Sequence, residues 1–459
     1  MDSVKEFLEL AERGKTGKKV EKNDWDMDYI IDHVQDLVEE YDFSWDRQVI
    51  IPEDEKLFKD IFIAAKKLLL ETGVYNMSTS RIITFTENEI DAGLKGMKSE
   101  LTLGSGKDAY TLRPRKIEDA ALPAIWAGSP GCPTPESMYY KNVLSSAKEP
   151  SIDLLTCGSL IDVDGYPVKN AEATEVLAVR RELEYMREAA EAVGRPGLGF
   201  LAAESAVTSV GDFAAVFENG LKPWDAHLTA MFNELIVDND NLARTANKFH
   251  SGVKNASLAC SMVGGLGGDA PGATIVMMAS MMAANLILAA DYHLCHPIHI
   301  TDIATSARGC MWLQSVLCQS FAVNAPAIIV CDLWPASGAM TKELLYETAA
   351  NAIVITVSGG HLEGVGSTNG SKPNGTGLEV RLMGEVGRAV AKQRMTRAEA
   401  NAIVLKLLER YEMVFKDKDK YSGKPFNEAY DMETVTPVSE WLAMYEEVKE
   451  ELVTLGVQL

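Results

Sequence analysis

Residues 194–204 read Gly-Arg-Pro-Gly-Leu-Gly-Phe-Leu-Ala-Ala-Glu. The turn around Pro196 and Gly197 leads into a short apolar run that ends on the carboxylate of Glu204, so the stretch predicts a strand with an acid at its tip. In α/β enzymes, catalytic groups gather at the carboxyl ends of the strands. We therefore expect Glu204 to lie in an active site and Leu201, inside the run, to lie close to it.

Similar apolar runs recur along the chain and alternate with helical segments, which predicts a parallel sheet. The runs cover residues 124–128, 152–158, 198–202, 256–261, 296–301, 327–332 and 352–358. The helical segments between them cover residues 172–193, 224–247, 271–291, 306–323 and 339–350. Seven runs are close to the eight of a (β/α)8 TIM barrel, and we expect the missing repeat within residues 206–222.

The regions outside this alternation are predicted to be mainly helical. Residues 1–120 form an accessory region packed on the barrel, with a helix over 54–72, a strand over 81–86 and a capping box at Thr86 and Glu89. Residues 121–459 form one structural unit, the barrel with a C-terminal helical extension over 378–411 and 438–455. The Gly-rich loop over 359–377 is either a surface connection or, as we prefer, a lid over the barrel mouth.

The composition narrows the class of protein. With 44 Lys plus Arg against 66 Asp plus Glu, the net charge is −22, which argues against a nucleic-acid binder. The 7 Cys are scattered and include no C-x-x-C pair, and residues 1–22 carry no apolar signal region, so we expect free thiols and a cytoplasmic protein. The uncharged stretch over 271–290 could span a bilayer by length, but its small residues favour a buried helix or a subunit contact and no membrane partner.

Two motifs invite a ligand and have simpler explanations. Gly264-Gly-Leu-Gly-Gly-Asp269 follows a predicted strand and precedes a helix, yet it fits no phosphate-loop pattern, so close packing is the better explanation. His293, His296 and His299 form H-x-x-H-x-x-H, which allows a zinc site. Period-two alternation would put His293 and His299 on one side and His296 on the other. We expect no metal and assign His299 to the polar mouth of the barrel.

The run that ends in Cys331-Asp332-Leu333-Trp334 places an acid and an indole on the same face of a strand. A carboxylate beside an aromatic face is what a site for a cationic amine needs. An ion pair beside a packed Trp at the barrel rim explains the same residues equally well. No Lys ends any of the runs, which argues against a Schiff-base aldolase.

Several segments taken together resemble the monomethylamine:corrinoid protein methyltransferases. The matching segments appear in order from the first helices to the C-terminus: Asn23-Asp-Trp-Asp26, Leu70-Glu-x-Gly73, 81–90 with Phe85-Thr-Glu87, Leu103-Gly-Ser-Gly106 with Asp108-Ala109, Val193-Gly-Arg-Pro-Gly-Leu-Gly199, His293-Leu with Pro297-Ile-His299, Leu378-Glu379, Met383-Gly-Glu-Val386 and Val435-Thr-Pro437.

The resemblance implies a (β/α)8 barrel, a homo-oligomer that is typically a hexamer, and transfer of a methyl group from an N-methyl donor to the Co(I) of a separate corrinoid protein. The corrinoid (cobalamin) belongs to that partner, and the chain itself holds none permanently. The family places a pyrrolysine at the position that is Leu201 in this chain. Family carboxylates are replaced by Leu228 and Leu258, and a Gln and a Tyr by Asp332 and Trp334, whereas Glu204 matches the family's acid.

These departures predict a member of the family that works without pyrrolysine. Glu204 and Asp332 are the predicted catalytic residues. The predicted substrate pocket consists of Leu201, Leu228, Leu258, His299, Asp332 and Trp334. A donor that is already activated, such as a quaternary amine, suits such a pocket. Three alternatives stay open: a monomethylamine enzyme in which Leu201 replaces pyrrolysine, a non-catalytic homologue that binds the corrinoid protein, and an unrelated barrel with a His-based metal site.

Overall fold

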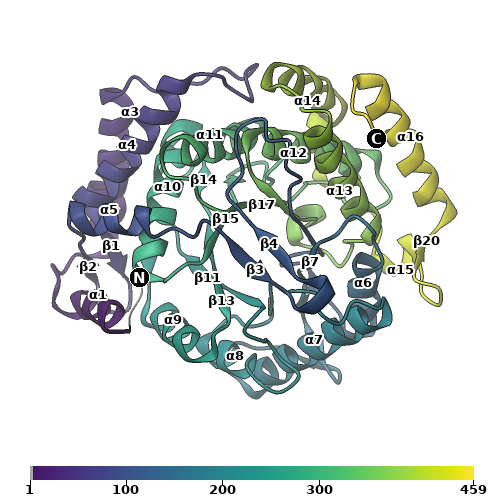
Figure 1. Cartoon of the computed structure of the whole chain (residues 1–459), viewed down its shortest axis with the longest axis horizontal. Coiled ribbons are helices and arrows are strands. Elements are labelled where there is room, and N and C mark those ends of the chain that lie inside the picture. Colours follow the sequence, from purple (N-terminus) through teal and green to yellow (C-terminus); the bar gives the residue numbers. More distant parts are fainter. Residues whose placement is uncertain (1–3) are drawn as a thin grey trace.

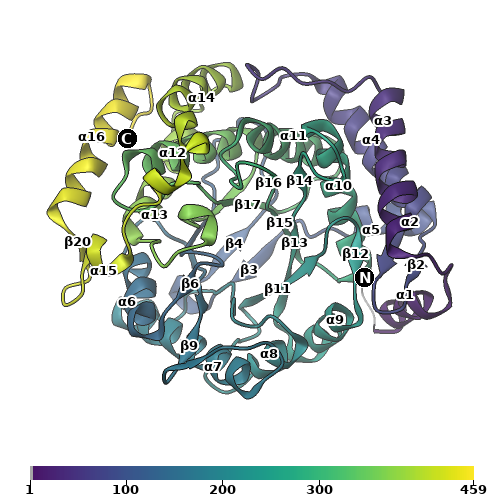
Figure 2. The ribbon, with the colours of Figure 1, turned by 180° about the vertical axis from the view of Figure 1, so that it is seen from behind.

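The computed structural model describes residues 4–459 and is built on a barrel of parallel strands (Figures 1 and 2). A seven-stranded sheet runs in the order β11 (Ala226–Met231), β13 (Lys254–Ala259), β15 (Tyr292–Cys295), β17 (Ile329–Leu333), β18 (His361–Gly364), β5 (Ile125–Ala127) and β7 (Leu154–Leu155). Two parallel bridges, Leu155 to Phe200 and Leu201 to Ala226, supply the eighth position and close the barrel. The predicted (β/α)8 fold is therefore confirmed.

Each of the eight barrel positions is followed by a helix, and these helices form the outer ring in Figure 1. In chain order they are α6 (Glu136–Ala147), α7 (Ala173–Ala192), α8 (Ser209–Ala214), α9 (Asn239–Ser251), α10 (Ala270–Ile287), α11 (Arg308–Asn324), α12 (Lys342–Ser358) and α13 (Gly377–Lys392). Helix α10 is long and apolar enough to cross a membrane, but all of its residues are buried inside the protein. The prediction of a buried helix is confirmed.

The accessory elements cover two sides of this ring. The N-terminal layer contains α1 (Val4–Thr16), α2 (Lys22–Asp24), η1 (Trp25–Asp32), α3 (His33–Glu40), α4 (Glu55–Thr72), α5 (Glu87–Lys95) and a small sheet of β1 (Val74–Asn76), β2 (Arg81–Ile83) and β12 (Ile236–Val237). The predicted capping box of Thr86 and Glu89 opens α5. Helices α14 (Arg397–Tyr411) and α16 (Ser439–Leu455) pack on the opposite side against α12.

The remaining elements are short. They are β6 (Pro133–Thr134), β8 (Ser159–Leu160), β9 (Asp162–Val163), β10 (Tyr166–Pro167), β14 (Met262–Val263), β16 (Ile298–His299), β19 (Tyr430–Asp431), β20 (Thr436–Pro437), α15 (Phe426–Ala429), η2 (Gly106–Asp108), η3 (Thr368–Gly370), η4 (Glu412–Lys416) and η5 (Lys418–Tyr421).

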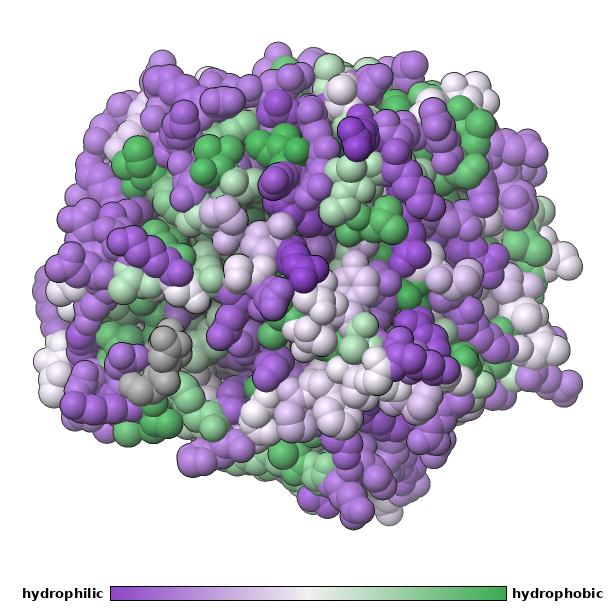
Figure 3. Space-filling view, in the orientation of Figure 1, coloured by the Kyte–Doolittle hydropathy of each residue, from purple (hydrophilic) through white to green (hydrophobic). Residues whose placement is uncertain are grey.

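A hairpin closes the amino-terminal end of the barrel. Its strands, β3 (Leu101–Leu103) and β4 (Tyr110–Leu112), cross the barrel axis in Figure 1. Their buried leucines join the apolar cluster that fills the barrel interior. The outer surface on this side is mostly hydrophilic, with apolar residues only in scattered spots (Figure 3). Access to the interior is therefore expected from the opposite end, where the strands have their carboxyl ends.

Two parts of the predicted alternation are wrong. The segment 224–247, predicted as one helix, contains β11 and β12 before α9 begins at Asn239. The missing repeat therefore lies here and not within 206–222, which holds α8 instead. In β11 the sequence Ala-His-Leu-Thr-Ala-Met mixes polar and apolar residues because His227 packs behind the sheet while Leu228 faces the interior. Because of this mixture, β11 lacks the continuous apolar run by which the other strands were predicted.

Strands β15 and β18 also lie away from their predicted positions. The run 352–358 is the last part of α12, which is apolar on every side because it is fully buried. The barrel strand that follows is β18, inside the predicted lid 359–377, most of whose residues are buried. Likewise, the run 296–301 follows β15 and contributes β16, which pairs with β14 outside the barrel.

The barrel position formed by Phe200 and Leu201 is held at its amino-terminal end by a buried carboxylate. Asp225 is fully buried, and its Oδ1 accepts a hydrogen bond from the amide of Phe200 at 3.0 Å. Its Oδ2 accepts from the amide of Lys222 at 2.8 Å and forms an ion pair with Arg187 of α7. The Asp225 side chain thus connects Phe200 to the start of β11 and to helix α7.

Replacing Asp225 with Ala is expected to lower the free energy of unfolding by about 3–5 kcal/mol, because it leaves Arg187 without its buried partner. Urea unfolding followed by circular dichroism measures this loss. The matched control is Glu9→Ala, which removes an exposed ion pair with Lys5 at 3.7 Å and is expected to cost less than about 0.5 kcal/mol. Equal effects of the two substitutions would contradict this role for Asp225.

Candidate active site

Two carboxyl groups face each other at the carboxyl ends of neighbouring barrel strands. Asp332 of β17 and Glu363 of β18 are register partners. Their exposed fractions are 4% and 1%. Both Oε atoms of Glu363 and Oδ1 of Asp332 are buried and make no well-formed hydrogen bond, although the two carboxyls and the Thr156 hydroxyl lie close enough to interact. An unpartnered buried carboxyl is costly, so this pair marks a site prepared for a ligand.

A third carboxyl group, that of Glu204, lies within electrostatic reach of this pair. Burial, followed by repulsion from Glu363, raises the pKa of Glu204 well above its ordinary value. Burial and repulsion from Asp332 raise the pKa of Glu363 in the same direction, and burial raises that of Asp332. The pKa of each of the three groups is therefore raised, and a nearby cation would lower it again by favouring the charged form.

A histidine and a tryptophan complete the rim of the site. Nδ1 of His296 lies 2.6 Å from Oδ2 of Asp332. The imidazole ring also contacts the Trp334 ring edge to face, with 4.3 Å between the ring centroids. Burial lowers the pKa of His296 to about 4, so the ring is neutral and its Nδ1–H donates to the carboxylate. His296 thus orients Asp332 without adding positive charge.

Glycines determine where Trp334 lies. A Cβ on Gly366 would lie 2.4 Å from Trp334 Nε1, and one on Gly370 would lie 2.7 Å from its Cη2. Gly131 makes a similar approach at 2.8 Å. These glycines allow the indole to pack against the backbone of the loop after β18, which is the segment that was predicted to be a lid.

The floor of the site is apolar. Leu201 is fully buried, and Leu228 and Leu258 pack at the edge of the same interior cluster as Trp126 and Tyr292. The three leucines come from adjacent barrel positions, since the bridge at Leu201 pairs with β11 and β11 pairs with β13. The structure therefore brings Leu201, Leu228 and Leu258 together in the barrel interior, and their role as a substrate pocket stays a prediction.

A second buried carboxylate holds the turn that carries Glu204. Glu182 of α7 accepts hydrogen bonds from the amides of Glu204 at 2.7 Å and Ser205 at 3.0 Å. It also accepts one from the Cys157 thiol at 3.0 Å. Burial raises the pKa of Glu182 to about 7. The acid that matches the family pattern is thus positioned by an acid on a helix outside the barrel.

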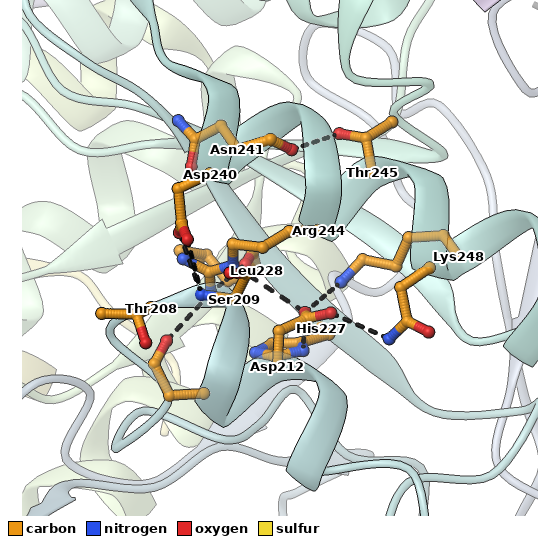
Figure 4. A network of polar contacts seen from close by, with 12 residues as sticks. Thr208, Ser209, Asp212, His227, Leu228, Asp240, Asn241, Arg244, Thr245 and Lys248 are labelled. Carbon is orange, nitrogen blue, oxygen red and sulfur yellow. Dashed lines mark hydrogen bonds and ion pairs between the residues drawn. The ribbon is translucent and has the colours of Figure 1, made fainter. Parts of the chain in front are cut away.

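A network of charged groups supports the back of β11 (Figure 4). Asp212 of α8 binds His227 at 2.6 Å and Lys248 at 2.9 Å. Arg244 donates to the carbonyl oxygens of Leu228 at 3.1 Å and Ala206 at 3.0 Å. These contacts connect α8 and α9 to the strand that presents Leu228, and they leave no cation of the network directed at the mouth.

The other predicted site residue, His299, is not part of this group. It lies on β16 and pairs with Asp302 at 3.1 Å, and no described contact joins it to Asp332 or Glu363. His296, which we had assigned to the opposite side from His293 and His299, is the histidine of the mouth. His293 points behind the sheet to Ser257 at 2.8 Å. Within residues 4–459 no group of three or more His, Cys, Asp or Glu could hold a metal ion.

Glu363 is the residue that the sequence analysis missed. It follows His361 and Leu362 in a segment rich in Gly, Ser and Asn, and a four-residue strand there leaves little periodicity to detect. All four residues of β18 are buried, so no alternation of buried and exposed residues marks the strand or the direction of Glu363.

The Gly264–Asp269 loop packs as expected. A Cβ on Gly272 would lie 2.0 Å from the carbonyl oxygen of Gly267, so the loop contacts the first turn of α10 directly. The loop also lines a cavity of about 640 Å³ beneath α3, to which none of the mouth carboxyls contributes. All seven cysteines are free thiols and six are buried, as predicted.

Known proteins show the same architecture along the whole chain. The family model described as "Monomethylamine methyltransferase MtmB" matches residues 6–457. The chain belongs to the monomethylamine methyltransferase family. The monomethylamine methyltransferases MtmB2 of Methanosarcina acetivorans and MtmB1 of Methanosarcina barkeri are each 31% identical over 451 residues, which cover 98% of this chain and 97% of each relative.

Solved structures agree with this assignment. The crystal structure of the Methanosarcina barkeri monomethylamine methyltransferase (MtmB) superposes with a TM-score of 0.95 at 30% identity, covering 99% of this chain and 98% of that chain. The crystal structure of the hydroxylamine MtmB complex matches equally well. The enzyme class that the family membership gives this chain is methyltransferase.

Replacing Glu182 with Ala is expected to reduce the free energy of unfolding by about 2–3 kcal/mol, because two buried amides lose their acceptor. Glu182→Gln keeps an acceptor oxygen and is expected to recover part of the loss. The control on the same helix is Glu188→Ala, which alters an exposed residue and should change stability by less than about 0.5 kcal/mol. Denaturant titration of the four proteins measures these differences. Similar stabilities of Glu182→Ala and Glu188→Ala would contradict the assignment.

The pH dependence of stability tests the state of Glu363. A carboxyl whose pKa is raised by folding stabilises the protein below its ordinary pKa, and this contribution is lost as the pH rises through the folded pKa. A glutamine at this position cannot ionise, so the Glu363→Gln variant does not lose this stability at high pH. Without ligand, its free energy of unfolding is expected to exceed that of the wild type by about 1–3 kcal/mol at pH 8 and by less at pH 5. Urea unfolding at both pH values measures the difference. A constant gap between the two proteins would show that Glu363 does not titrate in this way.

Proposed function

We propose that this chain transfers a methyl group from a cationic N-methyl compound, most simply a quaternary amine, to the Co(I) of a corrinoid (cobalamin) carried by a separate protein. The observation that carries the proposal is the group of Glu204, Asp332 and Glu363 at the barrel mouth. Their oxygens are partly unpartnered, and the nearest strong cations are turned away. A small organic cation would supply the missing charge.

The geometry matches what such a reaction needs. In the transfer, the carbon–nitrogen bond breaks with its electron pair remaining on nitrogen, and a bond forms between the methyl carbon and the partner's cobalt. A quaternary nitrogen leaves as a neutral amine without needing a proton. The carboxyls would balance the cation, Trp334 would offer an aromatic surface, and the leucine floor would exclude water.

The absence of pyrrolysine is part of this proposal. Leu201 lies in an apolar cluster with Leu154 and Tyr292 and offers no electrophile to hold an amine. The simultaneous presence of leucines at 201, 228 and 258 supports a rebuilt pocket over a single replacement in a monomethylamine enzyme. The codon at position 201 shows directly whether leucine is natively encoded there or stands in place of pyrrolysine.

The partners are proposed from the family as well. The acceptor would be a cognate corrinoid protein that docks at the mouth, and the chain would hold no corrinoid of its own. By resemblance we also propose a cytoplasmic homo-oligomer, a hexamer in the simplest case. The acidic charge of −22 speaks against nucleic-acid partners.

Methylation of a Co(I) corrinoid protein by this chain, measured spectroscopically across methylamines and quaternary amines, tests the proposed function. With the preferred donor, Trp334→Ala is expected to lower kcat/KM by about 3- to 30-fold, because the aromatic contact with the cation is lost. Asp332→Ala is expected to lower it by about 30-fold or more, because a buried charge partner is lost.

The control for this measurement is Glu446→Ala, which removes an exposed acid of α16 and should leave the rate unchanged. Unchanged transfer by Asp332→Ala or Trp334→Ala would rule out the proposed pocket. If no donor reacts although the corrinoid protein binds, the chain is a non-catalytic homologue.

A further inference from the structure

Every ionisable side chain that we place at the barrel mouth, apart from the neutral His296, is an acid. Glu204, Asp332 and Glu363 converge there from three different barrel positions, and Glu363 and Asp332 are more than nine-tenths buried with unpartnered oxygens. A ligand that enters this site therefore meets acidic side chains from several directions. The charge of the ligand, beyond its methyl groups, must decide whether it binds.

The nearest basic groups cannot neutralise an acidic ligand. Arg244 directs its guanidinium to the carbonyl oxygens of Ala206, Val207 and Leu228 and lies 3.8 Å from Asp212. Lys248 is committed to the same aspartate at 2.9 Å. Both cations come from α9 and approach Asp212 of α8 and the residues of β11 (Figure 4). Moving either one would remove one of the cations that balance the buried Asp212, which is costly.

The polar hydrogens at the mouth carry no positive charge. The Nδ1–H of His296 donates to Asp332, and the other nitrogen of a neutral imidazole is an acceptor. Trp334 Nε1 has no hydrogen-bond partner and lies against Gly366, where a Cβ would come within 2.4 Å. In the floor, Trp126 Nε1 and the Tyr292 hydroxyl are likewise unpartnered. Among residues 4–459, the groups that we place at the mouth therefore offer a ligand carboxylate only neutral donors and no cation.

We propose that the site selects monocationic N-methyl compounds without an acidic group of their own, such as tetraalkylammonium and choline-type donors, and rejects betaines. This inference rests on the proposed function insofar as it takes the barrel mouth as the donor site. It goes further by separating two classes of quaternary amine that share the same trimethylammonium head.

The physical reason is that a betaine brings its own counter-ion. Its carboxylate would have to be buried beside the acids of the mouth, with no cation to balance its charge or replace its hydration. The repulsion between like charges in a poorly hydrated pocket is far stronger than in water. A simple ammonium, in contrast, gains the attraction of all the acids and adds no anion.

Binding measured by calorimetry at pH 8 in the absence of any corrinoid protein tests this inference. The probes are tetramethylammonium, choline, glycine betaine and 3,3-dimethylbutan-1-ol, the last being an uncharged molecule of the shape of choline. Tetramethylammonium and choline are expected to bind at least about tenfold more tightly than the other two, a difference of about 1.4 kcal/mol. Choline and its uncharged analogue form the matched pair that separates charge from shape.

Two variants show whether the acids cause the preference. Glu363→Gln and Asp332→Asn keep the side-chain size and remove charge, so the ratio of choline affinity to betaine affinity is expected to fall about tenfold or more in each. Glu446→Gln serves as the control and should leave the ratio unchanged. Thermal unfolding of each variant without ligand confirms that the protein is folded.

The outcomes are separable from those of the proposed function. Glycine betaine binding as tightly as choline, or none of the cations binding, would overturn the inference whichever donor is later found to be methylated. Selective binding of the simple cations together with no methyl transfer to any corrinoid protein would leave this inference standing and overturn the proposed function.

Discussion

The barrel is closed by its shortest strand, and buried carboxylates hold that strand in place. Phe200 and Leu201 make only single bridges to their neighbours on either side, too few backbone hydrogen bonds to define a barrel position alone. Asp225 binds the amide of Phe200 on the amino side, and Glu182 binds the amides of Glu204 and Ser205 on the carboxyl side. The position of Leu201 in the interior and of Glu204 at the mouth depends on these two acids.

The mouth itself is left in an unfavourable electrostatic state. Elsewhere, buried acids have partners: Asp212 has His227 and Lys248, and the pKa of Asp212 is lowered accordingly. At the mouth, burial raises the pKa of Glu204, Asp332 and Glu363 instead, and repulsion from Asp332 adds to the rise at Glu204 and Glu363. Groups arranged at the expense of stability are a common sign of function. The contrast between the two clusters is the strongest reason to regard one as structural support and the other as a binding site.

The sequence patterns located most of the long helices, including the fully buried α10, and failed at β11, at the buried end of α12 and at β18. Helix α7 and the capping box of α5 appeared where they were expected. The buried end of α12 resembles a strand in composition and was predicted as the last strand. The actual strand, β18, was therefore included in the glycine-rich segment predicted to be a loop. The structure places the predicted Leu201, Leu228 and Leu258 in the barrel interior and Asp332 and Trp334 at the mouth, and their roles in a site stay predictions. Glu363 and His296 were not assigned to the mouth, because short strands give too little periodicity to show which side chains face inward.

The sequence by itself determined the fold class, the family and the position of the glycine-rich turn before Leu201, because these depend on residue order and on motifs that span the whole chain. Only the tertiary structure decided which ionisable groups meet. Glu204, Asp332 and Glu363 are separated by up to 159 residues, and nothing local to any of them reveals the other two. Parallel strands bring their carboxyl ends to one rim, and the balance of charge at that rim is a property of the closed barrel alone.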